Sequence, residues 1–162
     1  MNKSTYLKSA IFGIMDSLVS TVGFLAGIGA AGTSRSVIVM TGIIYASVEA
    51  FSMGVGDFLS EESKEQYEAR GEVSNRKSVI AGIAMFFASL LAAFIPLAPY
   101  MLFDLRVALW VSISCSIVAL FITGIISGRF SGVHAVRRGL KMALVGGVAI
   151  VIGVLVGRFL KV

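Results

Sequence analysis

The sequence is poor in charged residues, cysteine and histidine. Charged residues occupy 14% of the 162 positions, compared with about 25% in soluble domains. The lone cysteine, Cys115, excludes an intramolecular disulfide and any metal site built from several cysteines. The lone histidine, His134, lies beside Arg137 and Arg138 and is expected to be a solvated loop residue. Without histidine in the apolar stretches, zinc is a poor candidate for binding there.

Other missing features restrict the function further. The sequence has no Walker loop, no nucleotide-binding fingerprint and no nucleophile, base and orienting group in sequence, so an enzyme is not expected. The net charge of +5 comes from basic residues scattered between apolar stretches, which argues against a nucleic-acid partner. No Ser/Pro-rich linker divides the chain, so residues 1–162 are expected to form one domain.

What the sequence does contain is apolar. Hydrophobic residues make up 57% of the chain, and the mean hydropathy is +0.92. A membrane helix needs about 20 apolar residues to cross a hydrocarbon core of about 30 Å. The sequence therefore predicts an all-α, multi-pass integral membrane protein with a single transmembrane domain. The predicted spans are 9–29, 36–59, 78–97, 106–127 and 140–160, with a short acidic segment at 60–77.

Proline and basic residues predict where the chain turns and how it is oriented. Pro96 and Pro99 are expected to mark the turn after the third span, because proline interrupts a helix. Loops rich in Lys and Arg stay in the cytoplasm, so the division of these residues predicts a cytoplasmic N-terminus and an external C-terminus. The ten residues expected inside are Lys3, Lys8, Lys64, Arg70, Arg76, Lys77, Arg129, Arg137, Arg138 and Lys141, and the four outside are Arg35, Arg106, Arg158 and Lys161.

Acidic residues inside two predicted spans are the candidate functional residues. Glu49, Met53 and Asp57 recur every four residues and share one face of the second span, while Asp16 lies at the level of Met53 on the first span. A carboxylate at such a depth costs at least about 2.5 kcal/mol and usually faces water, a partner or a transported ion. No basic residue lies inside either span to pair with these acids. We call Asp16, Glu49, Met53 and Asp57 the ligand set, and we expect it to bind metal.

The chemistry of the ligand set suggests the ion. Carboxylates alone suit Mg²⁺, Ca²⁺ or Mn²⁺, whereas a thioether shifts preference toward a softer ion such as Fe²⁺. We therefore expect Fe²⁺ or Mn²⁺ as a transported ion, with no prosthetic group. One chain supplies few ligands, and a homodimer would double them, with Gly23 and Gly27 as the expected contact on the first helix. A cytoplasmic patch expected to attract cations consists of Glu61, Glu65, Glu68 and Glu72.

Three segments resemble one known family. FGIMDSLVSTVGFLAGIGAAG in the first span, SVEAFSMGVGDFLSEESKEQYEAR in the second and RRGLKMALVGGVAIVIGVLVGRFL near the C-terminus are similar to the vacuolar iron transporters. The resemblance covers nearly the whole chain. It implies a five-helix homodimer that exports Fe²⁺, and often Mn²⁺, from the cytosol in exchange for protons. It also implies an ion path at the dimer interface, with an aspartate at the position of Asp16 and a methionine at that of Met53.

The chain also departs from that family pattern. Family members usually have glycine where this chain has Ser17, and commonly have glutamate where it has Tyr45. Glu49, one turn nearer to Met53, could take over the role of that glutamate. The acidic segment is also too short for the three-helix cytoplasmic metal-binding domain of well-known members. Two alternatives therefore stay open, a membrane metal-binding or regulatory protein that does not transport, and a transporter of an organic cation held by Glu49 and Tyr45.

Overall fold

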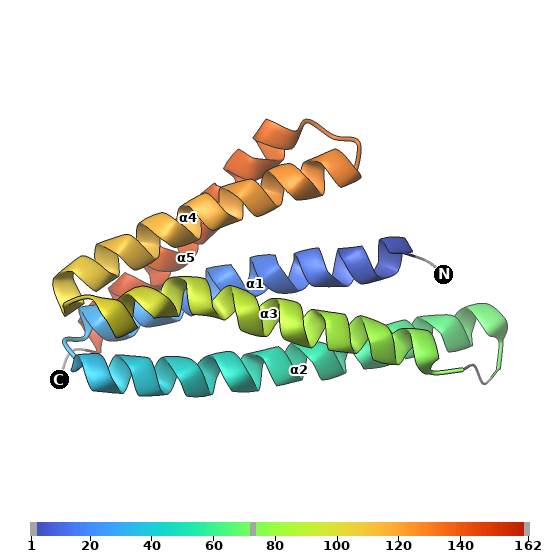
Figure 1. Ribbon diagram of the computed structural model, residues 1–162, viewed down its shortest axis with the longest axis horizontal. Coiled ribbons are helices and arrows are strands. Elements are labelled where there is room, and N and C mark those ends of the chain that lie inside the picture. Colours follow the sequence, from blue (N-terminus) through green and yellow to red (C-terminus); the bar gives the residue numbers. More distant parts are fainter. Residues whose placement is uncertain (1–2, 72–73, 161–162) are drawn as a thin grey trace.

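The part of the chain described by the computed structural model, residues 3–71 and 74–160, forms five α-helices (Figure 1). Each of the five is long and apolar enough to cross a membrane, which confirms the predicted all-helical membrane fold. The helix ends differ from the predicted spans by up to ten residues. The helices are α1 (Lys3–Ala30), α2 (Arg35–Ala69), α3 (Arg76–Leu102), α4 (Leu105–Phe130) and α5 (Ala135–Phe159).

Helix α1 lies at the centre of the bundle and contacts the other four helices. In the most apolar stretch of α1, half of the residues are buried, compared with 17% in that of α5. Helix α5 therefore has far more surface exposed on the outside of the bundle. Helix α2 runs alongside α3, and α4 forms a hairpin with α5 (Figure 1). At the end of the bundle that holds the N-terminus, this hairpin leans away from α1 (Figure 1).

Small residues let α1 and α5 pack backbone to backbone. A Cβ atom added to Gly27 would lie 2.8 Å from the carbonyl oxygen of Gly153, and one added to Gly23 would lie 3.0 Å from that of Ala149. Both distances are shorter than ordinary contacts, so neither glycine leaves room for another helix on this face. This corrects the prediction that Gly23 and Gly27 form the contact between two copies, because α5 of the same chain occupies their face.

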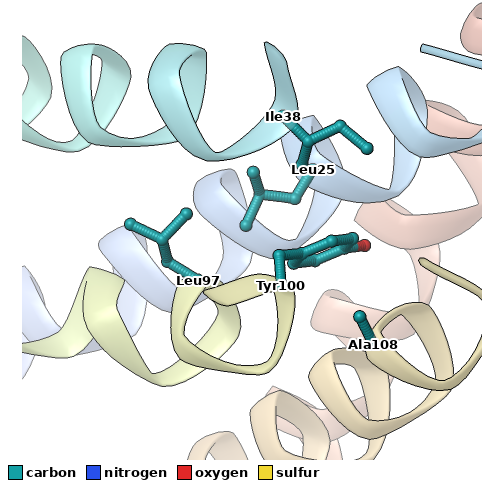
Figure 2. Close-up of a cluster of buried hydrophobic side chains, with 5 residues drawn as sticks. All are labelled: Leu25, Ile38, Leu97, Tyr100 and Ala108. Atoms are coloured by element: carbon teal, nitrogen blue, oxygen red, sulfur yellow. The ribbon is translucent and has the colours of Figure 1, made fainter. Parts of the chain in front are cut away.

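A fully buried apolar cluster closes the end of the bundle opposite the N-terminus (Figure 2). Its members come from α1, α2, α3 and α4, and each is 0% exposed. None of the candidate ligands belongs to this cluster, and its one polar group is the Tyr100 hydroxyl, which is buried without a hydrogen-bond partner among the described residues. The five residues are Leu25, Ile38, Leu97, Tyr100 and Ala108.

Both prolines lie inside α3, which corrects the prediction that they mark a turn. A proline has no N–H to donate to the carbonyl four residues earlier, so Pro96 and Pro99 leave the carbonyls of Ala92 and Ile95 without their usual helical donors. Other carbonyls of this part of α3 accept hydrogen bonds from side chains of neighbouring helices. Here the Ser112 hydroxyl of α4 donates to the carbonyl of Pro96 at 2.7 Å. The Arg35 guanidinium donates to the carbonyl of Tyr100 at 2.6 Å. These contacts tie the end of α3 to α4 and α2, and the helix continues past Pro99 to Leu102.

Helix α2 is longer than a membrane is thick. Its 35 residues span about 52 Å at 1.5 Å per residue, compared with a hydrocarbon core of about 30 Å. It ends only at Arg70, whose left-handed conformation (φ 52°) closes the last turn. The first part of the predicted acidic segment, residues 60–69, is therefore a helical extension of the second span.

Candidate functional site

The site lies where α1 and α2 run antiparallel past each other. Near the apolar cluster, the ring of Tyr45 stacks on that of Phe24, with centroids 4.3 Å apart and planes 11° from parallel. One turn further along α2, the carboxylate of Glu49 is close enough to Ser20 and Thr21 of α1 to interact with them. The two helices are thus aligned so that Glu49 faces the turn of α1 that follows Asp16.

Asp16 is exposed on the surface of the single chain. It lies ten residues after the start of the first membrane-crossing stretch at Tyr6, which is a depth of about 15 Å. Its side chain has no salt bridge among the described residues, and the exposed ring of Phe12 lies one turn away. A carboxylate facing lipid at this depth is costly. The exposed face of α1 around Asp16 therefore needs a cover that is more polar than lipid.

Glu49 is half-buried and only half satisfied. The Tyr45 hydroxyl donates a hydrogen bond of 3.0 Å to Oε1 of Glu49. The other oxygen, Oε2, is buried and has no hydrogen-bond partner in the described part of the chain. Asp16 is near enough for its charge to act on Glu49. The nearby Thr21 hydroxyl is likewise buried without a partner among the described residues, so this part of the site has unused hydrogen-bonding capacity.

Met53 is held from the side of α3. The Ser89 hydroxyl lies 3.5 Å from Sδ of Met53, and the Ser17 hydroxyl donates to the backbone carbonyl of Ser89 at 2.8 Å. These contacts place Met53 at the level of Ser17, and so of its neighbour Asp16, as the sequence predicted. Sequence reasoning noted Ser17 only as a departure from the family pattern and missed Ser89. Their occurrence as small polar residues in apolar spans is the signal that could have identified both.

Asp57 lies one turn beyond Met53 and is also incompletely satisfied. It is half-buried, and its Oδ2 atom is buried without a hydrogen-bond partner among residues 3–71 and 74–160. It therefore resembles Glu49 in having one carboxylate oxygen available for a proton or a cation. Asp57 and Glu49 are two helical turns apart on α2, so they are separate positions along one face.

The acidic patch on the extension of α2 is largely paired within the chain. Glu61 lies 3.6 Å from the ammonium group of Lys64, and Glu65 lies 3.3 Å from that of Lys77. The Ser78 hydroxyl also approaches Glu65, at 3.5 Å. Glu68 is exposed, and Glu72 lies outside the described residues. The contacts of Glu65 therefore join α2 to α3, and attraction of cations by the patch stays a prediction.

No complete metal site forms within one protomer. In the part of the chain that the structure describes, no three side chains of His, Cys, Asp or Glu come together closely enough to hold an ion. Asp16 is near enough for its charge to act on Glu49, and Met53 lies at the level of Asp16, whereas Asp57 lies one turn away. Further ligands for a bound ion must therefore come from water, from helix movement or from another chain.

Five helices long and apolar enough to cross a membrane define a multi-pass integral membrane protein. Residues 7–79 and 70–158 match the VIT family. The chain is 30% identical over 156 residues to vacuolar iron transporter homolog 4 of Arabidopsis thaliana, covering 90% of this chain and 78% of that protein. The chain belongs to the VIT family, which is a family of transporters and not of enzymes.

Of two further relatives, one is named as an iron transporter and the other is uncharacterised. Vacuolar iron transporter 1 of Arabidopsis thaliana is 23% identical over 203 residues, covering 88% of this chain and 81% of the relative. An uncharacterised protein of Methanocaldococcus jannaschii is 26% identical over 171 residues, covering 94% and 88% of the two chains. All three alignments extend over most of both proteins, so the likeness concerns the whole helical bundle.

Proposed function

We propose that this protein exports a divalent transition metal ion from the cytosol in exchange for protons. The ion is Fe²⁺, with Mn²⁺ as a second cargo, and its path lies where two copies of the chain meet. The names of two relatives, both vacuolar iron transporters or their homologs, support iron as the cargo. The thioether of Met53 beside carboxylates supports the same choice, because mixed oxygen and sulfur ligands favour Fe²⁺ over harder ions.

The observation that carries the proposal is the state of three membrane-embedded acids. Oε2 of Glu49 and Oδ2 of Asp57 are buried without partners, and Asp16 is exposed at a depth that lipid would cover. A structural ion pair would explain acids at such positions, but the salt bridges among the described residues involve other groups. Exchangeable cations, namely protons and metal ions, account for all three acids together.

A second copy of the chain would complete the path. On α2, Ser52 and Gly56 lie three residues after Glu49 and Met53, on the same side of the helix, and both are exposed. A two-fold axis along this face would bring two copies of the ligand set together and cover both Asp16 side chains. With a cytoplasmic N-terminus, as the distribution of basic residues predicts, Asp57 would lie nearest the cytosol and Glu49 deepest. Metal would then pass Asp57 before it reaches Asp16, Met53 and Glu49.

Proton coupling follows from the chemistry of carboxylate ligands. A carboxylate must lose its proton to bind metal, so protons and metal compete for the same oxygens. Protons that arrive from the outer compartment would displace the ion and remain on the acids until the site faces the cytosol again.

Transport by purified protein in liposomes tests the proposal. Fe²⁺ influx is measured with an encapsulated metal-sensitive dye, and proton movement with a pH-sensitive dye. We expect Asp16→Asn to abolish both fluxes, because it removes a charge but keeps the size of the side chain. The matched control, Asp104→Asn, changes an exposed acid at the start of α4 and should transport normally. Normal transport by Asp16→Asn would refute the scheme, and metal binding without flux would indicate a binding or regulatory protein.

One observation favours a second candidate function. The stacked rings of Phe24 and Tyr45 lie beside the carboxylate of Glu49. Aromatic rings next to a carboxylate form a common binding arrangement for organic cations. Competition decides between the cargoes, because an organic cation such as tetramethylammonium should inhibit Fe²⁺ flux only if it binds this same site.

A further inference from the structure

A groove separates the N-terminal half of α1 from the hairpin of α4 and α5. It has a volume of about 430 Å³ and lies where Figure 1 shows the hairpin leaning away from α1. Ile11, Phe12 and Met15 of α1 and Phe130 of α4 give it apolar walls, and Lys8 and Arg138 lie at its edge. The groove is therefore amphipathic, with cations supplied by two separate segments of the chain.

The surroundings of the groove are strongly cationic. No acidic residue follows Asp104 in the sequence. Among the described residues, the recorded salt bridges involve only Lys64 and Lys77 as cations, so the cations of the hairpin are not paired. Those near the turn between α4 and α5 are Arg129, Arg137, Arg138 and Lys141.

The start of α5 adds to this positive potential. The first turns of a helix expose backbone N–H groups and the positive end of the helix dipole, so acidic residues are usually favoured there. Helix α5 has no acid in its first turn, and the side chain of its N-cap residue, His134, makes no capping hydrogen bond. Arg137 and Arg138 are the third and fourth residues of α5. The positive charges of these two guanidinium groups are repelled by the positive end of the helix dipole. A bound anion would reduce this repulsion.

We propose that this groove binds an anionic phospholipid. Its phosphate would lie between Lys8 and Arg138, and an acyl chain would follow the apolar wall of α1. That wall runs from Leu7 to Met15, a depth of about 12 Å at 1.5 Å per residue, which suits a lipid tail and would leave a soluble anion beside an unfilled apolar surface. Basic pockets between membrane helices bind lipid headgroups in this way.

Control of orientation alone does not explain these features. Basic residues in a loop are enough to keep that loop in the cytoplasm. Orientation does not explain why a groove is present, or why Lys8 of α1 and Arg138 of α5 both line it. No member of the ligand set lines the groove, although Phe12 and Met15 at its deep end adjoin Asp16 on α1.

Native mass spectrometry of the full chain in detergent tests the proposal. Dioleoylphosphatidylglycerol and dioleoylphosphatidylcholine are added in equal amounts, and the bound lipids are counted. We expect preferential retention of the glycerol lipid by the wild-type protein. Removing two cations with Lys8→Gln and Arg138→Gln together should weaken this binding roughly 25-fold, because each cation at an anionic surface contributes a factor of about five. The matched control, Arg106→Gln with Arg158→Gln, removes two exposed cations at the opposite end and should bind normally.

A groove-filling variant separates this site from general attraction to a charged surface. Ser131 lines the groove and is exposed, so Ser131→Trp should block the lipid while all cations remain. The proposal fails if the wild-type protein shows no preference for the anionic lipid, or if Ser131→Trp binds it as well as wild type. Displacement of the lipid by millimolar inorganic phosphate would show a soluble-anion site instead. Loss of the lipid on formation of dimers would show that a second copy occupies the groove.

Discussion

Replacing Met53 with leucine removes the sulfur atom from the ligand set with little change in packing. The two side chains have similar volumes, and such exchanges usually cost less than about 1.5 kcal/mol of stability. Met53 is half-buried, and the polar contact it loses is the one from the Ser89 hydroxyl at 3.5 Å. A thioether is a weak hydrogen-bond acceptor, so this loss adds little. Met53→Leu should therefore fold normally, and any change in transport would report on the sulfur as a ligand.

The expected effect is a change in ion selectivity. Residues that only orient a metal ligand typically contribute 10- to 100-fold to metal affinity. Loss of a ligand itself should therefore lower the apparent affinity for Fe²⁺ by at least roughly 10-fold. Mn²⁺ prefers oxygen ligands and should be affected much less. Rates of Fe²⁺ and Mn²⁺ uptake into proteoliposomes, measured across a range of concentrations, give the ratio of apparent affinities. An unchanged ratio in Met53→Leu would show that the sulfur does not bind the transported ion.

Ser89→Ala is the companion variant. It leaves the thioether in place and keeps the backbone carbonyl that accepts the hydrogen bond from Ser17, but it removes the hydroxyl that holds Met53 toward α3. If Ser89 positions the sulfur, this variant should change the Fe²⁺ to Mn²⁺ ratio less than Met53→Leu does, and without loss of folding. A larger effect than that of Met53→Leu would show that Ser89 has a separate role.

Three further predictions concern packing and pH. Leu97→Ala should lower stability by about 2–5 kcal/mol, measured by thermal unfolding in detergent, because Leu97 is fully buried; Leu91→Ala, at a side chain 67% exposed, should change it little. Gly27→Val should force α1 and α5 apart and reduce the yield of monodisperse protein, whereas Gly147→Val, with no atom within 4 Å of the added Cβ, should be tolerated. Metal binding measured by calorimetry should weaken as the pH falls from 7.5 to 5.5, since its carboxylate ligands must be deprotonated; equal affinity at both values would argue against carboxylate ligands.

The number and order of the helices could be predicted because each membrane span must be a long apolar segment. The ends were less predictable. Helix α2 continues through polar residues to Ala69, where hydropathy gives no signal of a helix. Pro96 and Pro99 lie inside α3, where hydrogen bonds from Ser112 and Arg35 support nearby carbonyl groups. Such support depends on contacts between distant parts of the chain, which a pattern along the sequence does not reveal.

The positions of the site residues along the helix axes could be predicted more easily than the neighbours that their side chains contact. The rise per residue is fixed in a helix, so counting residues along two antiparallel spans was enough to align Asp16 with Met53. Rotation about the helix axis depends on packing instead. It decides that Gly23 and Gly27 face α5, that Tyr45 stacks on Phe24 and that Ser89 reaches Met53. Contact between two copies depends on the same rotation.

The apolar cluster at the end of the bundle opposite the N-terminus limits how a cargo can leave. Because Leu25, Ile38, Leu97 and Tyr100 come from three different helices and are fully buried, a hydrated ion near Glu49 meets a dry barrier inside its own protomer. Crossing that barrier without helix movement would strip the ion of its water and offer it no charged replacement. In the proposed scheme, release would therefore follow either a separation of these helices or a lateral route outside this core. The slow step of the proposed cycle would then be a rearrangement of the protein and not the diffusion of the ion.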